Sequence, residues 1–186
     1  MLGTLDRLEL QYVVTGSAAS SVHGLWRATG DVDVVVRLLP EDIDPLAKEL
    51  GAEFYIDEGE ARASIETGRS FNVIHFESAF KFDIFPLKND RYQQEQFARR
   101  RFESADVFGE SPVELAVCSP EDVILSKLRW YRQGGEVSEQ QWNDVLGVIA
   151  VQGERLDLDY MREWAAYLEV GDLLEQVLSE RHEEGR

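Results

Sequence analysis

The chain has 186 residues, of which 44% are hydrophobic and 30% charged, which is typical of one globular domain or of a catalytic core with a helical appendage. Its formal net charge of −17 argues against unspecific binding to DNA, to RNA or to an anionic membrane surface. The single cysteine excludes an internal disulfide, three scattered histidines argue against a Cys/His metal cluster, and no apolar run is long enough to predict a transmembrane helix.

The first part of the chain predicts alternating strands and helices. A short helix over residues 2–8 precedes a strand at Tyr12–Val14, which ends at Gly16. A helix rich in Ala and Ser follows over Ser17–His23, with Ser17 as its expected N-cap. The valines of the next strand, over Val32–Leu38, predict a position inside a sheet. A helix over Ile43–Leu50, with Pro45 in its first turn, is closed by Gly51.

The middle of the chain predicts more strands. A short strand over residues 53–56 is followed by a charged, irregular segment with some helical potential over residues 57–68. Two alternating runs, Phe71–Phe76 and Phe80–Phe85, indicate a hairpin. A polar helix is expected over Arg91–Arg101, and a strand pair over residues 102–108 and 113–117, around Gly109.

The last third predicts helices only. Ser119-Pro120-Glu121-Asp122 is a strong helix start, because it combines a cap residue, a proline in the first turn and an acidic residue three positions after the cap. This helix should end near Arg132, and three more are expected over residues 138–151, 159–168 and 172–182. The fold class is therefore α/β (α+β), a mixed-sheet core over residues 1–118 followed by a helical bundle over residues 119–186 that packs on the core.

Two aspartates begin the strand that contains the valine run. Asp31 and Asp33 are two residues apart, so their side chains point to the same side of the strand. At roughly 5 Å and an effective dielectric of about 20, two such carboxylates repel by about 3 kcal/mol. A divalent cation removes this repulsion, and hard oxygen ligands suit Mg²⁺ or Mn²⁺. The alternative is a pair of solvated acids at an exposed edge, which the buried character of Val34–Val36 opposes.

A third carboxylate, Asp83, lies within an apolar run. A buried aspartate there would need a partner or a metal ion. The alternation leaves a second interpretation open, in which Asp83 shares the solvent-facing side of the strand with Lys81 while Phe82 and Ile84 are buried.

These elements together resemble the nucleotidyltransferase superfamily whose fold is shared with DNA polymerase beta. The resemblance rests on a Gly-Ser turn, a D-x-D pair and a later single aspartate between apolar residues. It implies that Gly16 and Ser17 hold nucleotide phosphates. It also implies that Asp31, Asp33 and Asp83 bind two divalent metal ions, Mg²⁺ or Mn²⁺. The substrate so implied is an NTP, and the three aspartates are the implied catalytic metal ligands.

A narrower resemblance covers most of the chain. The segments R27-A-T-G-D-V-D, S-P-E-D-V-I-L-S-K-L and Q-Q-W-N-D-V-L are similar to bacterial nucleotidyltransferase-like proteins related to abortive-infection toxins. It implies that Lys127 binds the triphosphate and that Asp144 orients Lys127 or acts as general base. Arg27 and Thr29 flank the D-x-D pair as candidate nucleotide contacts. Without the resemblance, the simpler interpretation is that Lys127 and Asp144 are solvated helix residues. Arg27 would then pair with one of the many acids.

The implied reaction is transfer of a nucleoside monophosphate to a hydroxyl, with release of pyrophosphate. The acceptor stays open between an RNA end such as that of tRNA, a protein and a small molecule, and an aminoglycoside would suit the acidic chain. The alternatives are a non-catalytic nucleotide-binding or interaction module paired with a cognate toxin or antitoxin, and a phosphotransferase using the same residues. The lone cysteine and the lack of a signal-peptide pattern favour a cytoplasmic protein, without membrane association.

Overall fold

A computed structural model of the chain describes residues 1–27, 29–105 and 112–184. The chain forms two compact units, which are described separately. Unit 1 comprises Met1–Ala18 and Thr29–Val117, and unit 2 comprises Ala19–Ala28 and Cys118–Arg186. The segment 19–28 is therefore assigned to the unit that contains the C-terminal helices. The predicted single boundary between residues 118 and 119 places it in the core instead. The predicted domains themselves stay a prediction, because compact units need not be independent domains.

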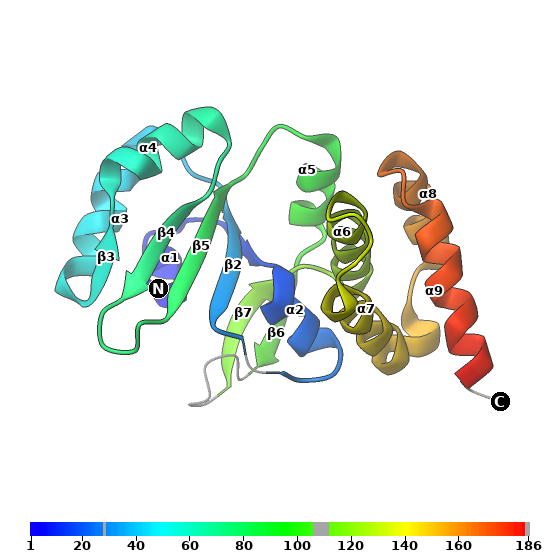
Figure 1. Ribbon diagram of the computed structural model, residues 1–186. Helices are drawn as coiled ribbons and strands as arrows, with labels where there is room; N and C mark the ends of the chain where they lie inside the picture. The colour runs from blue at the N-terminus through cyan, green and yellow to red at the C-terminus, as the bar shows by residue number, and fades with distance from the viewer. Residues whose placement is uncertain (28, 106–111, 185–186) are drawn as a thin grey trace. The chain divides into compact units, whose positions relative to one another are not determined.

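Unit 1 is built on a mixed sheet with the strand order β3-β4-β5-β2-β1-β7-β6. Figure 1 shows β4, β5 and β2 side by side. The strands are β1 (Tyr12–Val14), β2 (Asp31–Val36), β3 (Phe54–Ile56), β4 (Phe71–His75), β5 (Lys81–Pro86), β6 (Arg101–Ala105) and β7 (Val113–Val117). β2 runs parallel to β5 and antiparallel to β1, and β4 and β5 form the expected hairpin. The mixed sheet and the interior position of β2 are confirmed.

The core of unit 1 follows the alternation in its strands. Val32, Val34 and Val36 are fully buried on β2, and Phe82 and Ile84 are buried on β5. Because side chains alternate along a strand, the residues between them, the aspartates of both strands, lie on the opposite face. The sheet thus places the candidate residues away from its main apolar face.

The helices of unit 1 correct two expectations. They are α1 (Leu2–Arg7), α3 (Ile43–Leu50), α4 (Glu58–Thr67) and α5 (Arg91–Ala98), with short 3-10 turns at Pro40–Asp42 and Gly51–Glu53. The segment 57–68 is a regular helix, because the Asp57 carboxylate caps the Glu60 N–H and Gly68 ends the helix in a left-handed conformation. α5 ends at Ala98, because Arg101 already begins β6. The strand expected over 102–108 is seen up to Ala105, and the rest of it and Gly109 lie outside the described residues.

Helix α2 (Gly16–His23) begins one residue before the predicted start. Gly16 has a φ of +61°, a conformation that side chains rarely adopt, and it lets the chain turn from β1 into the helix. Ser17 therefore lies inside the first turn and is not the N-cap, which corrects the prediction. The division between the two units passes within this helix, after Ala18.

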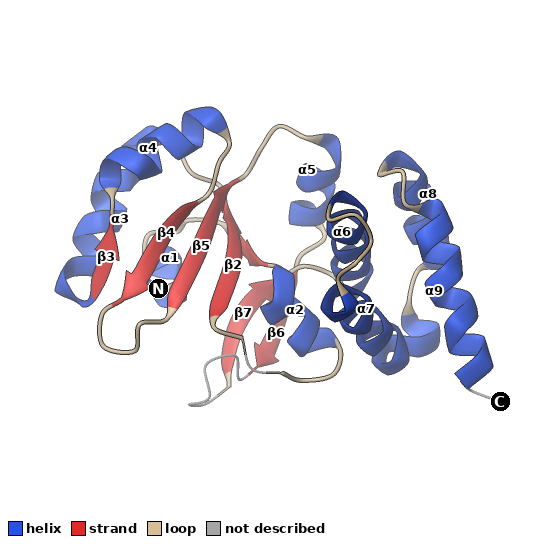
Figure 2. Ribbon diagram, viewed as in Figure 1, coloured by secondary structure: helices blue, strands red, loops and turns tan. Residues whose placement is uncertain are grey.

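Unit 2 contains the helices α6 (Pro120–Gln133), α7 (Glu139–Gln152), α8 (Leu158–Tyr167) and α9 (Gly171–Glu184), seen in Figure 2 with a 3-10 turn at Gly153–Arg155. Ser119 and Ser138 accept hydrogen bonds from backbone N–H groups of the first turns of α6 and α7, as predicted. Leu125, Leu128, Ile149 and Leu174 form part of the buried core of this unit. In the described part of the chain, no helix combines the length and apolarity that crossing a membrane requires.

Candidate functional site

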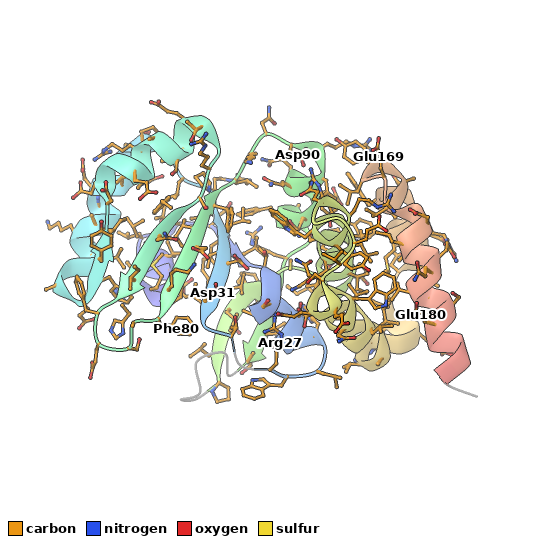
Figure 3. The ribbon with its side chains drawn as sticks, viewed as in Figure 1. Arg27, Asp31, Phe80, Asp90, Glu169 and Glu180 are labelled. Carbon is orange, nitrogen blue, oxygen red and sulfur yellow. The ribbon has the colours of Figure 1, made fainter. Side chains whose placement is uncertain are left out.

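The three predicted aspartates come together on one face of the unit 1 sheet. In the parallel pair β2–β5, Asp33 lies opposite Asp83, and Asp31 lies opposite Lys81. Residues paired in register point to the same side of a sheet, so the three carboxylates and the Lys81 ammonium share one face. Figure 3 shows Asp31 where β2 begins. The structure thus assembles the predicted acidic group from two strands about 50 residues apart in sequence.

Lys81 lies among these carboxylates. Its Nζ is 2.8 Å from Oδ2 of Asp83 and 3.7 Å from Oδ2 of Asp31. The hydrogen bond with Asp83 raises the pKa of Lys81, and the charge of Asp31 adds to the effect, whereas partial burial opposes it. The ammonium is therefore charged at neutral pH and offsets part of the negative charge of the group.

The donor chemistry of this face fits divalent metal ions. Carboxylate oxygens are the hard ligands that Mg²⁺ and Mn²⁺ prefer, and a cation, the Lys81 ammonium, already lies among them. Among the side chains that the structure describes, no three acidic, histidine or cysteine residues are gathered as a ready-made metal site. The metal-binding roles of Asp31, Asp33 and Asp83 stay predictions.

Gly16 and Asp33 are in close contact. A Cβ atom added at Gly16 would lie 1.9 Å from Oδ2 of Asp33, so only glycine leaves room for the carboxylate. The backbone N–H of Thr15 donates to the carbonyl oxygen of Asp33 over 2.9 Å, which joins the end of β1 to β2 at the same place. The start of α2 thus lies against one carboxylate of the D-x-D pair. Helix N-termini favour negative charge, so this contact is electrostatically favourable.

Replacement of Gly16 with alanine is expected to destabilise the protein. The new methyl group clashes with the Asp33 carboxylate and the backbone keeps a strained positive φ, which together cost about 1 to 3 kcal/mol. Urea unfolding of Gly16→Ala, Asp33→Ala and the double variant in metal-free buffer measures this cost. In the Asp33→Ala background the cost of Gly16→Ala should be smaller, because the clashing oxygens are gone. An equal cost in both backgrounds would show that the contact does not matter.

Thr29 orients one of the aspartates. Its hydroxyl lies 2.9 Å from the backbone oxygen of Asp31 and 3.2 Å from Oδ1 of the same residue. This geometry favours a role in fixing the Asp31 side chain over the predicted direct contact with a nucleotide. The latter role stays a prediction.

A second group of predicted residues comes together in unit 2. Lys127 on α6 donates from Nζ to Oδ2 of Asp144 on α7 over 2.7 Å. Arg27 donates from Nε and Nη2 to the two oxygens of the same carboxylate over 3.1 and 3.3 Å. The Lys127 and Asp144 side chains are each only 9% exposed, and Arg27 is 33% exposed. The interpretation of Lys127 and Asp144 as solvated helix residues is therefore wrong, and Arg27 does pair with an acid.

The electrostatics of this trio favour one of the two roles predicted for Asp144. Burial alone would raise the pKa of the Asp144 carboxyl, but hydrogen bonds from Arg27 and Lys127 lower it below the ordinary value. A carboxylate with a lowered pKa is a poor general base at neutral pH. Asp144 is thus better suited to orienting Lys127 and Arg27, and the trio keeps one net positive charge in an acidic chain.

Sequence reasoning missed Lys81 and the contact between Gly16 and Asp33. The alternation of β5 placed Lys81 on the face of Asp83, which was a usable signal, but the register with Asp31 depends on how β2 and β5 pair. The contact between Gly16 and Asp33 could not be predicted from their spacing in the sequence, because it depends on how β1, β2 and α2 come together.

Protein-family models and curated protein sequences give no match to this chain. Solved structures do. An antigenic nucleotidyltransferase-like protein from Paracoccidioides brasiliensis matches 96% of the chain over 88% of its own length, with 17% identity and a TM-score of 0.52. ANT(2")-Ia in complex with adenylyl-2"-tobramycin matches 90% of the chain over 92% of its own length, with 15% identity and a TM-score of 0.54. The chain therefore has the nucleotidyltransferase fold shared with DNA polymerase beta, as the first resemblance implied; the narrower one, to proteins related to abortive-infection toxins, stays a prediction.

Proposed function

We propose that this protein is a metal-dependent nucleotidyltransferase, which moves a nucleoside monophosphate from an NTP to a hydroxyl and releases pyrophosphate. One observation carries the proposal: Asp31, Asp33 and Asp83 share one face of neighbouring parallel strands in a chain with the nucleotidyltransferase fold. Three carboxylates on one face are costly unless cations balance them. Such a group is expected where charge must be neutralised at a reacting phosphate.

The three aspartates are the residues that would hold the Mg²⁺ or Mn²⁺ ions. Bound divalent ions supply charge neutralisation at the reacting phosphate and lower the pKa of a coordinated hydroxyl. The chain's own residues position this group. Thr29 fixes the Asp31 carboxylate, and Gly16 leaves space for that of Asp33. The N-terminal end of α2 at Gly16 and Ser17 provides a dipole that favours phosphate oxygens.

Lys127 and Arg27 are the proposed cationic contacts of the triphosphate. Asp144 holds both side chains in place, so little side-chain freedom is lost when they bind an anion. Arg27 offers a planar fork of donors that suits phosphate oxygens, and Lys127 provides a point charge. Together with Asp144, the two cations carry a net charge of +1, whereas the whole chain carries −17.

For the acceptor, we favour a cationic small molecule with a free hydroxyl over an RNA end. A net charge of −17 attracts cations and repels a polyanion, and ANT(2")-Ia, whose fold the chain shares, was solved with adenylyl-2"-tobramycin. An NTP-dependent reaction also suits the predicted cytoplasmic location. A protein acceptor and a toxin–antitoxin partner stay alternative predictions.

A transfer assay tests this proposal. The protein is incubated with each α-³²P-labelled NTP and Mg²⁺ or Mn²⁺, together with an aminoglycoside panel, total tRNA or a protein extract. We expect label in the aminoglycoside fraction, with none above background for the Asp31→Ala/Asp33→Ala double variant. Label in tRNA or protein instead would overturn the acceptor class but keep the reaction. No label in any fraction above that of the double variant would favour the non-catalytic module.

A further inference from the structure

Lys81 has no role in the proposed reaction, yet its position is closely defined. It begins β5, pairs in register with Asp31 of β2, and lies two residues before Asp83 on the same face. Its Nζ contacts Asp83 at 2.8 Å and approaches Asp31 to 3.7 Å, so one ammonium bridges carboxylates of two different strands. A lysine that only faced solvent would need neither of these contacts.

The charge balance of the face explains why a cation is found there. The pairing of β2 and β5 places three carboxylates on one face of the sheet, with Asp33 opposite Asp83 and Asp31 opposite Lys81. One ammonium offsets one of these charges, and a divalent ion would offset two at the same oxygens. Lys81 and a metal ion therefore compete for Asp31 and Asp83.

We propose that the Lys81 ammonium is a built-in counter-ion, which holds Asp31 and Asp83 in place in the metal-free protein and must be displaced when a divalent cation binds. Lys81 thereby lowers the metal affinity of the site and keeps its carboxylates ordered until metal arrives. The inference rests on the proposed function, because it takes these aspartates to be the metal ligands.

The side chain is suited to such an exchange. Lys81 is 38% exposed, so its ammonium can move into water without disturbing the core, while Phe82 and Ile84 keep β5 anchored on the opposite face. A lysine has a flexible stem and a compact charge, so it can leave by rotation about its own bonds. Asp83, at 18% exposure, is the more buried of the two partners and has more need of a cation.

Metal titration of a neutral variant tests the inference. Lys81→Met keeps the length of the side chain and removes its charge. Isothermal titration of the metal-free protein with Mn²⁺ should give a Kd lower than that of the wild type by about fivefold or more, since a like charge no longer opposes the metal. The matched control is Lys48→Met, which removes the same charge from an exposed position of α3 in unit 1 and should leave the Kd unchanged.

A second readout needs no metal. In excess EDTA, Lys81→Met should melt about 2 °C or more below Lys48→Met, because its three carboxylates lack their counter-ion. Lys81→Arg, which keeps the positive charge, should bind Mn²⁺ no more tightly than the wild type does. If Lys81→Met fails to fold, a tighter Kd for Lys81→Gln supports the inference, and an unchanged one overturns it.

The outcomes separate this inference from the proposed function. If the wild type binds Mn²⁺ and Asp83→Asn does not, but Lys81→Met binds it no more tightly, the counter-ion role is wrong and the metal site stands. If Lys81→Met binds more tightly while no label is transferred, the counter-ion role stands and the enzymatic proposal falls. If neither the wild type nor Lys81→Met binds Mn²⁺, the counter-ion role is overturned together with the metal site.

Discussion

Replacement of Asp83 with asparagine is expected to reduce nucleotidyl transfer on the order of 10³-fold, because stabilisation of charge by bound metal is worth several kcal/mol at the transition state. Asparagine has the size of aspartate but lacks the negative charge that holds a divalent ion. Since Asp83 lies opposite Asp33 and contacts Lys81, the change removes one of the three carboxylate charges of the group. Initial rates of label transfer at saturating NTP and acceptor give the measurement.

Asp6→Asn is the matched control, because Asp6 is an exposed aspartate of α1 in the same unit. It removes the same charge from the chain and should transfer label at the wild-type rate. Circular dichroism and the urea midpoint of Asp83→Asn show that the fold persists. A folded Asp83→Asn protein with wild-type transfer would remove Asp83 from the proposed metal ligands.

The sheet around these aspartates was largely predictable from the sequence. Its signals are local: the valines of β2, the alternation in β4 and β5, and the cap at Ser119. Local signals predict structure reliably when burial and hydrogen bonding agree with them. The shared face of Asp31 and Asp33 needs only the period of a strand. The charged segment that forms α4 shows only some helical potential in sequence, although Asp57 caps the helix and Gly68 ends it in a left-handed conformation.

Contacts that depend on how strands and helices pair in three dimensions could not be predicted from the sequence. Lys81 meets Asp31 only because β2 and β5 are parallel and in one particular register, and a shift by one residue would send it to the other face. Arg27 is predicted as a nucleotide contact, with pairing to an acid as the alternative, and which acid it meets depends on the packing of α7 within unit 2. The acidic composition offered many equally plausible partners, so spacing alone could not choose Asp144.

Asp144→Ala is expected to lower the free energy of unfolding by about 3 kcal/mol. The change leaves the buried ammonium of Lys127 and the guanidinium of Arg27 without their shared carboxylate. Urea unfolding at pH 7 measures the loss. The matched control is Asp172→Ala, whose carboxylate contacts Arg132 at 2.7 Å but is 71% exposed, so solvent already screens the pair and little stability should be lost.

The pH dependence of this loss gives a sharper test than its size. The pKa of Asp144 in the folded protein lies below the ordinary value of 3.8, because the hydrogen bonds from Arg27 and Lys127 outweigh the effect of burial. A lowered folded pKa means that the carboxylate contributes its full stability above about pH 4 and loses it as the pH falls through the folded value. The difference in unfolding free energy between wild type and Asp144→Ala should therefore be constant from pH 7 to pH 5 and shrink below pH 4. A difference that stays the same below pH 4 would contradict a stabilising ion pair and point to packing of the side chain as its contribution.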